Sequence, residues 1–172
     1  MASVLVAYAS KYGSTREVAE TVASVLIERG VDAVARPAGE VRSLDGYSAA
    51  VLGTALYFFM WRGEAHRFLR RNRKALSAMP VALFGLGPIE DTTEQFEGAR
   101  EHLGKGLAKH PWLSPVSTAV FGGRLDPAHL RFPDNNPAMR SMAAIDLLVL
   151  DTVRAWADGL VEALDPERQS ST

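Results

Sequence analysis

The stretch that decides the fold lies near the start of the chain and reads Val4-Leu5-Val6-Ala7-Tyr8-Ala9-Ser10-Lys11-Tyr12-Gly13-Ser14-Thr15. Residues 4–9 are a continuous apolar run with the length of a buried strand, and residues 10–15 are a polar turn that contains a glycine. Residues 17–29 then carry apolar side chains at every third or fourth position, which is typical of an amphipathic helix. The stretch therefore predicts a strand, a short turn and a helix that begins at the turn.

The turn over residues 10–15 combines the features of a phosphate site. Free backbone N–H groups and the positive end of the helix dipole attract an anion, and Gly13 allows the backbone to approach it closely. Hydroxyl donors come from Ser10, Ser14 and Thr15. The turn lacks both the lysine-terminated pattern of triphosphate loops and the G-x-G-x-x-G pattern of dinucleotide folds, so it predicts one terminal phosphate, as in a mononucleotide such as FMN. The alternative is simple helix capping, because Ser and Thr are ordinary N-cap residues.

The composition predicts one domain. A chain of 172 residues with 47% hydrophobic content can build one well-buried core but not two comfortable ones. We expect a single domain over residues 1–165 and a polar tail over residues 166–172. The formal net charge is −1, so no overall field attracts nucleic acid, and no nucleic-acid partner is expected.

The chain has no cysteine, which excludes disulfides, thiolate catalysis and cysteine-ligated metal clusters. Any redox chemistry must therefore come from a bound cofactor. The sequence shows neither a charged leader with a long apolar core nor an apolar stretch of about 18 residues. We expect a cytoplasmic protein without a transmembrane segment, with peripheral membrane contact left open.

Apolar runs and amphipathic segments alternate along the rest of the chain. Runs with the length of buried strands lie at residues 4–9, 31–36, 49–54, 81–85 and 117–121. Five strands that alternate with helices predict an α/β fold, with a parallel sheet covered by helices on both faces. Ligands of such sheets bind at the carboxyl ends of the strands, so the loops that begin near Ser10, Thr54 and Gly85 are expected to converge.

A long insertion over residues 122–145 separates the last strand from the last helix. Its prolines and the pair Asn135-Asn136 prevent a long regular element. Its apolar side chains favour an ordered flap over a linker; they are Phe132, Met139, Met142 and Ile145.

Two further loops carry candidate binding residues. The first is Thr54-Ala55-Leu56-Tyr57-Phe58-Phe59-Met60-Trp61, in which four aromatic residues occur among the last five. Aromatic rings at the end of a strand are suited to sandwiching a planar ring, with Tyr57 or Trp61 as the stacking residue. The alternative is that Phe58 and Phe59 are core anchors under the loop. The second loop begins Gly85-Leu86-Gly87-Pro88, and its glycines let the backbone pass close to a ring edge or simply turn towards the next helix.

The basic and histidine residues give weaker signals. A run of cations is interpreted mainly as a solvated helix face, with binding of an acidic partner, substrate carboxylates or anionic lipid as the alternative; it comprises Arg67, Arg70, Arg71, Arg73 and Lys74. The four histidines share no metal-ligand spacing and are expected to be surface or partner-contact residues; they are His66, His102, His110 and His129. No metal site is predicted.

Five motifs, spread over nearly the whole chain, share their order and spacing with one superfamily. They are Tyr8-Ala9-Ser10-Lys11-Tyr12-Gly13-Ser14-Thr15, Leu52-Gly53-Thr54-Ala55-Leu56-Tyr57 with Trp61, Leu83-Phe84-Gly85-Leu86-Gly87-Pro88, Phe121-Gly122-Gly123-Arg124-Leu125-Asp126 and Val153-Arg154-Ala155-Trp156-Ala157. The chain thus resembles the flavodoxin-like superfamily, and within it the small bacterial branch related to menaquinone-dependent protoporphyrinogen dehydrogenase.

The resemblance implies a three-layer sandwich with strand order 2-1-3-4-5 and noncovalently bound FMN. It implies that the phosphate lies on Ser10, Lys11, Tyr12, Gly13, Ser14 and Thr15. The isoalloxazine ring would lie beside Thr54, Ala55, Leu56, Tyr57, Phe58 and Trp61. The pyrimidine edge would lie near Gly85, Leu86, Gly87 and Pro88.

The function expected from this resemblance is that of an FMN-dependent oxidoreductase. It would pass electrons between a reduced donor and a quinone- or porphyrinogen-class partner, with the flavin supplying the chemistry and the protein supplying orientation. The alternative is a non-catalytic electron shuttle that docks with redox proteins. A scaffold that has lost its flavin is the third interpretation.

Overall fold

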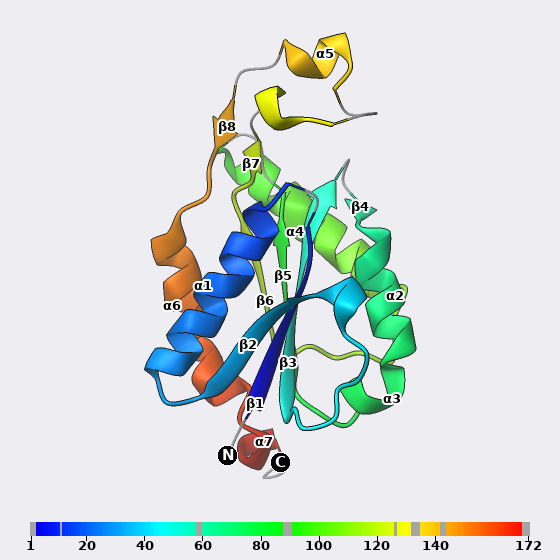
Figure 1. The fold of residues 1–172 in the computed structure, drawn as a ribbon, viewed down its shortest axis with the longest axis vertical. Helices are drawn as coiled ribbons and strands as arrows, with labels where there is room; N and C mark the ends of the chain where they lie inside the picture. Colours follow the sequence, from blue (N-terminus) through cyan, green and yellow to red (C-terminus); the bar gives the residue numbers. More distant parts are fainter. Residues whose placement is uncertain are drawn as a thin grey trace.

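Five parallel strands form the centre of the molecule in the computed structural model (Figure 1). The structure describes residues 3–10, 12–57, 60–87, 91–125, 127–131, 135–141 and 144–169. The parallel strands are β1 (Ser3–Ala9), β2 (Asp32–Pro37), β3 (Ala49–Tyr57), β5 (Val81–Leu86) and β6 (Ser117–Phe121). Their order in the sheet is β2-β1-β3-β5-β6, which confirms the predicted order 2-1-3-4-5 of the parallel strands.

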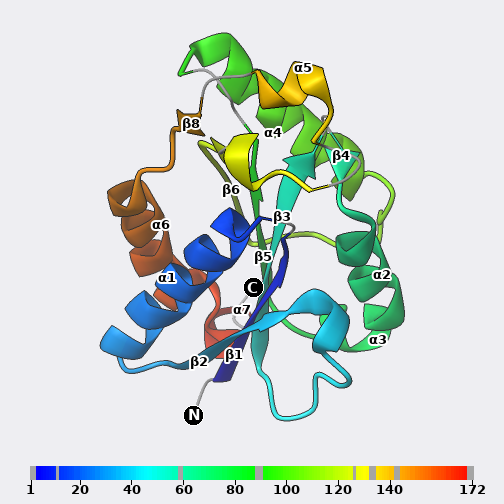
Figure 2. The ribbon, with the colours of Figure 1, turned by 45° about the horizontal axis from the view of Figure 1, so that its top comes forward.

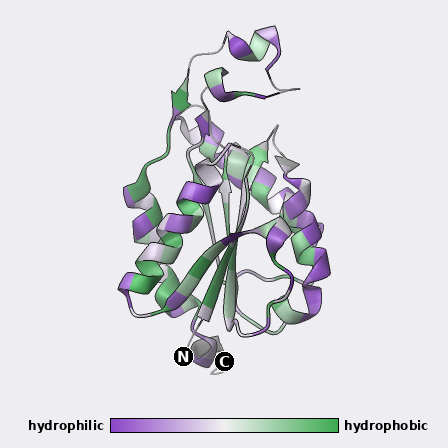
Figure 3. Ribbon diagram, viewed as in Figure 1, coloured by the Kyte–Doolittle hydropathy of each residue, from purple (hydrophilic) through white to green (hydrophobic). Residues whose placement is uncertain are grey.

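Helices cover both faces of the sheet, as predicted. On one face lie α1 (Ser14–Glu28) and α6 (Leu150–Ala163), and on the other lie α2 (Gly63–Arg71), α3 (Arg73–Leu76) and α4 (Thr93–Leu107). Strand β1 serves both layers: Val4, Val6 and Tyr8 belong to the core under α1 and α6, whereas Leu5 and Ala7 belong to the core under α2 and α4. A strand buried on both faces reads as a continuous apolar run, and Figure 3 shows the central strands largely in the hydrophobic colour.

The segment after β4 (Met60–Trp61) forms two consecutive helices. The apolar positions Phe68, Leu69 and Leu76 predict a single segment, but α2 ends at Arg71 and α3 begins at Arg73. Between them Asn72 is buried, and its Nδ2 donates to the backbone oxygen of Phe68 at 2.9 Å. This side-chain bond to the preceding turn accompanies the end of α2.

The aromatic loop is largely a hairpin. Strand β3 continues to Tyr57, beyond the predicted end at residue 54, and pairs in antiparallel fashion with β4 (Met60–Trp61). Ala55, Leu56 and Tyr57 are therefore strand residues, which corrects their assignment to a loop. The antiparallel pairing of Leu56 with Trp61 and of Tyr57 with Met60 extends the strand, and it is the physical reason for the longer β3.

The insertion folds back on itself beyond the carboxyl ends of the strands (Figures 1 and 2). Its base is a short antiparallel pair, β7 (Arg124–Leu125) with β8 (Ile145–Asp146). Between them lie a 3-10 turn, η2 (Pro127–His129), and α5 (Pro137–Arg140). The described part of the insertion holds no long helix or strand, the ordered flap stays a prediction, and Phe132 and Met142 lie outside the described residues.

The remaining short elements lie at the periphery. They are η1 (Ala38–Glu40), after β2, and α7 (Pro166–Gln169), in the segment predicted as a polar tail. The single-domain boundary at residue 165 stays a prediction. In the part of the chain that the structure describes, no helix is both long and apolar enough to cross a membrane.

Candidate functional site

Three strand ends meet at the carboxyl edge of the sheet, as the fold predicts. In the register of the sheet Ala9 lies opposite Thr54, and Thr54 lies opposite Gly85. The segments that follow β1, β3 and β5 therefore start side by side. Such an edge is where open parallel sheets bind their ligands.

The turn after β1 is built around Gly13. This residue has φ of +91°, a left-handed conformation that glycine adopts without strain, and it immediately precedes α1. Its N–H donates to Ser10 Oγ at 3.0 Å, and its carbonyl oxygen accepts the N–H of Glu17 at 3.0 Å. The N–H groups of residues 14–16 are then the first of the helix and have no acceptor in the preceding turn of α1. They are the donors that an anion at this turn would use.

Thr15 supplies the observation that points to a ligand. The residue is 1% exposed, and its Oγ1 is buried without a hydrogen-bond partner. A buried hydroxyl that lacks a partner costs about 1–3 kcal/mol, so folded proteins rarely retain one without a use. Together with the N–H groups at the start of α1, this hydroxyl fits the phosphate of a mononucleotide. Lys11 lies outside the described residues.

Thr54 holds the neighbouring hairpin in place. It is 2% exposed, and its Oγ1 donates to the Ala55 carbonyl oxygen at 3.2 Å. Thr54 Oγ1 also accepts a hydrogen bond from the N–H of Arg62 at 3.2 Å. The hydroxyl of Thr54 therefore joins the end of β3 to the start of α2. Its predicted role beside a cofactor stays a prediction.

Leu56 brings the second and third segments together. A Cβ added at Gly85 or Gly87 would lie 3.1 or 3.0 Å from Leu56 Cδ1, so glycine at both positions lets Leu56 pack against β5. Leu86 is buried, and the N–H of Gly87 donates to the Phe121 carbonyl oxygen at 3.3 Å. The glycines are thus explained by packing, and their role beside a ring edge stays a prediction. Pro88 lies outside the described residues.

Trp61 is an internal residue rather than a surface platform. Its exposed fraction is 6%, and its indole stacks on the His66 imidazole with ring centroids 5.0 Å apart. Tyr57 ends β3 at the ligand edge, and stacking of Tyr57 or Trp61 on a flavin stays a prediction. The side chain of Tyr57 and the whole of Phe58 are outside what the structure describes.

His66 and His110 are buried, so their assignment to the surface is wrong. They are 9% and 1% exposed, and His66 Nδ1 lies 2.8 Å from His110 Nε2. Burial, followed by the positive charges of His110, Lys109 and Arg70, lowers the pKa of His66 to about 4, and burial also lowers the pKa of His110. The burial of His66 could have been predicted from the sequence, because His66 lies three residues before Leu69 on the apolar face of α2.

Metal binding has no support in the described residues. Among them, no group of three or more His, Asp and Glu side chains could hold a metal ion.

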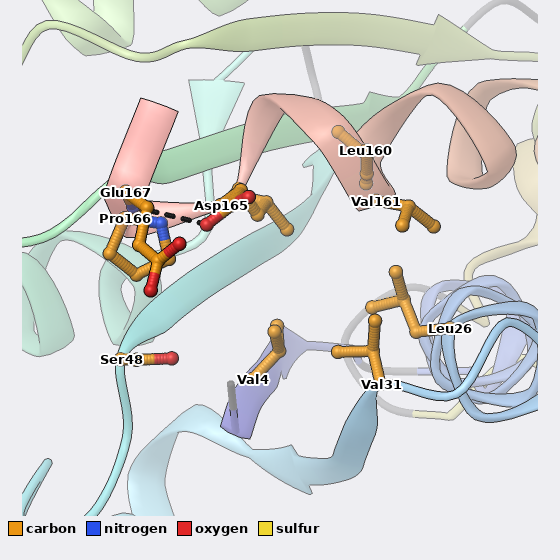
Figure 4. A pocket seen from close by; sticks show the side chains of 10 residues that line it. Val4, Leu26, Val31, Ser48, Leu160, Val161, Asp165, Pro166 and Glu167 are labelled. Carbon is orange, nitrogen blue, oxygen red and sulfur yellow. Dashed lines mark hydrogen bonds between the residues drawn. The ribbon is translucent and has the colours of Figure 1, made fainter. Parts of the chain in front are cut away.

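A hollow of about 480 Å³ opens near the amino ends of the strands, away from the ends that bind ligands in such sheets (Figure 4). Val4, Leu26, Val31 and Leu160 form part of its wall, with Asp165 nearby. Val4 lies near the start of β1, about 20 Å along the strand from Ser10 at the rise of an extended chain. The hollow is therefore separate from the carboxyl edge.

A parallel sheet with a phosphate-type turn at the carboxyl end of β1 defines a mononucleotide-binding α/β protein. The flavodoxin domain model matches residues 5–144, and this chain belongs to the flavodoxin domain family. FMN is the cofactor of that family, which confirms the predicted cofactor. No curated protein sequence matches the chain.

Solved flavodoxin structures share the fold at low sequence identity. A short-chain flavodoxin associated with a bacterial microcompartment is 18% identical, with a TM-score of 0.60 over 96% of this chain and 100% of that chain. A flavodoxin from the domain Archaea is 14% identical, with a TM-score of 0.58 over 94% and 98%. Oxidised Flavodoxin 2 from Bacillus cereus is 20% identical, with a TM-score of 0.57 over 94% and 99%. The relationship to the protoporphyrinogen dehydrogenase branch stays a prediction.

Proposed function

We propose that this protein is an FMN-dependent oxidoreductase that passes electrons from a reduced donor to a quinone-class acceptor. The observation that carries the proposal is the buried, unpartnered hydroxyl of Thr15 at the start of α1, at the edge where flavodoxins bind their cofactor. The N–H groups of residues 14–16 would hold the phosphate together with this hydroxyl. The β3–β4 hairpin would flank the ring.

The insertion supports an acceptor that binds next to the flavin. Its described elements η2 and α5 lie beyond the carboxyl ends of the strands (Figure 2), and at this position they would limit the access of water to the site. Bound FMN supplies two-electron chemistry, and a quinone that takes up two electrons and two protons becomes a quinol. The donor must release the same two electrons and two protons, as a reduced nicotinamide with a solvent proton or a porphyrinogen can do.

The cofactor part of the proposal is tested by substitution of Thr15. The Thr15→Val variant keeps the shape of the side chain and removes the hydroxyl, so it is expected to weaken FMN binding about tenfold. Thr21→Val is the matched control, because Thr21 lies on the same helix and its Oγ1 donates to the Glu17 carbonyl oxygen at 2.8 Å, away from the turn. Quenching of flavin fluorescence measures both affinities. Equal FMN affinity in the wild type and in Thr15→Val would contradict the assigned site.

The acceptor part is tested with FMN-loaded protein that has been reduced anaerobically. Addition of a soluble quinone should restore the oxidised flavin spectrum and form the quinol in equal amount, with repeated turnover when donor is in excess. Failure to reduce the quinone, combined with rapid electron exchange with a redox protein, would favour the electron shuttle instead. A porphyrinogen and a reduced nicotinamide are compared as donors in the same assay.

A further inference from the structure

The insertion brings two arginines to the turn after β1. The Arg124 side chain on β7 forms an ion pair with Glu17, which lies in the first turn of α1. The Arg131 guanidinium lies over the Tyr12 ring, with 5.8 Å between its central carbon and the ring centroid. Tyr12 belongs to the turn itself, so both contacts join the insertion to the same end of the molecule.

The ion pair between Arg124 and Glu17 neutralises a negative charge beside the phosphate site. A carboxylate in the first turn of α1 stabilises the helix dipole, but it also repels a phosphate that binds there. Arg124 offsets the charge of Glu17, and its Nε also donates to Asp146 Oδ1 on β8 at 3.1 Å. The β7–β8 pair therefore fixes Arg124 beside α1.

The second contact is held by buried anchors. Pro127 and Leu130 are buried, and Leu130 is directly followed by the exposed Arg131. Their burial holds the backbone that leads into Arg131, and the arginine side chain extends over Tyr12. A guanidinium carries a fixed charge and several donors, which suits it to phosphate.

We propose that the insertion forms the cationic part of the cofactor site, in which Arg131 supplies positive charge to the phosphate and Arg124 cancels the charge of Glu17. The inference rests on the proposed FMN function and adds a selectivity to it. The described donors of the turn, which are the N–H groups of residues 14–16 and the hydroxyl of Thr15, are neutral and recognise a phosphate without neutralising its charge. The two arginines strengthen the preference of the site for FMN over riboflavin, and their charge makes the affinity for FMN fall as salt increases.

The role of Arg131 is tested with FMN and riboflavin in parallel, at low and high salt, by fluorescence quenching. Arg131→Gln should weaken FMN binding about tenfold, leave riboflavin binding unchanged and reduce the salt dependence of FMN binding. Arg140→Gln is the matched control, because Arg140 is an exposed cation on α5 of the same insertion. Unchanged FMN affinity in Arg131→Gln, or an equal loss for both flavins, overturns the assignment.

The role of Arg124 is tested by removal of both partners. Arg124→Gln should weaken FMN binding, and the double variant Glu17→Gln with Arg124→Gln should recover most of that affinity, because the exposed carboxylate is gone. Asp146→Asn controls for the other contact of Arg124, and riboflavin affinity reports whether each variant is folded. A double variant as weak as Arg124→Gln overturns the charge-cancelling role.

The wild type and the arginine variants together separate the two levels of the proposal. A preference for FMN over riboflavin that falls in Arg131→Gln supports the inference. A preference for FMN that both arginine variants keep in full overturns the inference and leaves the proposed function standing, whereas no affinity for either flavin in the wild type overturns both.

Discussion

Gly106 shows how a single missing side chain lets two elements approach. A Cβ at this position on α4 would lie 2.2 Å from Cε2 of Trp61, closer than any Cβ contact in a folded protein. Gly104 lies on the same helix, and a Cβ there would meet nothing within 4 Å. The glycine at 106 is therefore required by the indole of β4, whereas the glycine at 104 has no such constraint.

We expect Gly106→Ala to destabilise the protein by about 1–3 kcal/mol, because the added methyl group must displace Trp61 from its packed position. Gly104→Ala, the control, should be neutral or stabilising by about 0.5–1 kcal/mol, since alanine favours the helix more than glycine does. Urea denaturation measures both free energies of unfolding. Equal effects of the two substitutions would contradict the packing of α4 on Trp61.

At the level of secondary-structure elements, a stack of three aromatic rings joins β4, α2 and the segment after α4. Trp61 comes from β4, His66 from α2 and His110 from the segment after α4, and the three rings stack on one another. The sequence predicts the helix that carries His66, but it does not predict this pairing, because 44 residues separate the two histidines. Contacts of this kind depend on tertiary packing, which periodicity does not report.

This histidine pair predicts a loss of stability on acidification. The pKa of His66 is about 4 in the folded protein and 6.5 in its ordinary state, so between these values the unfolded chain binds more protons. The contribution of the neutral His66 to the free energy of unfolding is therefore complete above about pH 6.5. It is lost as the pH decreases towards about 4, which lowers the free energy of unfolding by about 1–2 kcal/mol.

His66→Asn keeps a polar atom near the position of Nδ1 and removes the titration, so its stability should fall less over the same pH range. Exposed His129 provides the control, and His129→Gln should behave as the wild type. Urea denaturation at several pH values makes the comparison. The same pH dependence in His66→Asn and the wild type would show that the buried pair is not responsible.

At the scale of the whole molecule, the sequence predicts the sheet better than the site. Buried parallel strands read as apolar runs, so residues 4–9 and 81–85 identify β1 and β5 to within a residue or so. The β4 strand has only two residues, and its aromatic composition reads equally well as a binding loop. The arginine contacts of the insertion with Glu17 and Tyr12 are absent from any local pattern, because they depend on how β7 and β8 pair.

The position of Thr15 also couples cofactor binding to the stability of the entire protein. Without a ligand the buried hydroxyl is an unpaired group, so Thr15→Val should raise the free energy of unfolding of the flavin-free protein by about 1 kcal/mol. Addition of FMN at about 100 times its Kd should stabilise the wild type by about 2.7 kcal/mol, and the same FMN concentration should stabilise Thr15→Val by less. The variant is then expected to melt at a higher temperature than the wild type without FMN, and the wild type is expected to gain more stability from FMN.

Thermal unfolding with and without FMN tests this expectation, with Thr21→Val as the control that gains no stability in the flavin-free state. A Thr15→Val variant that is less stable than the wild type without FMN would mean that the hydroxyl serves the fold itself rather than the cofactor.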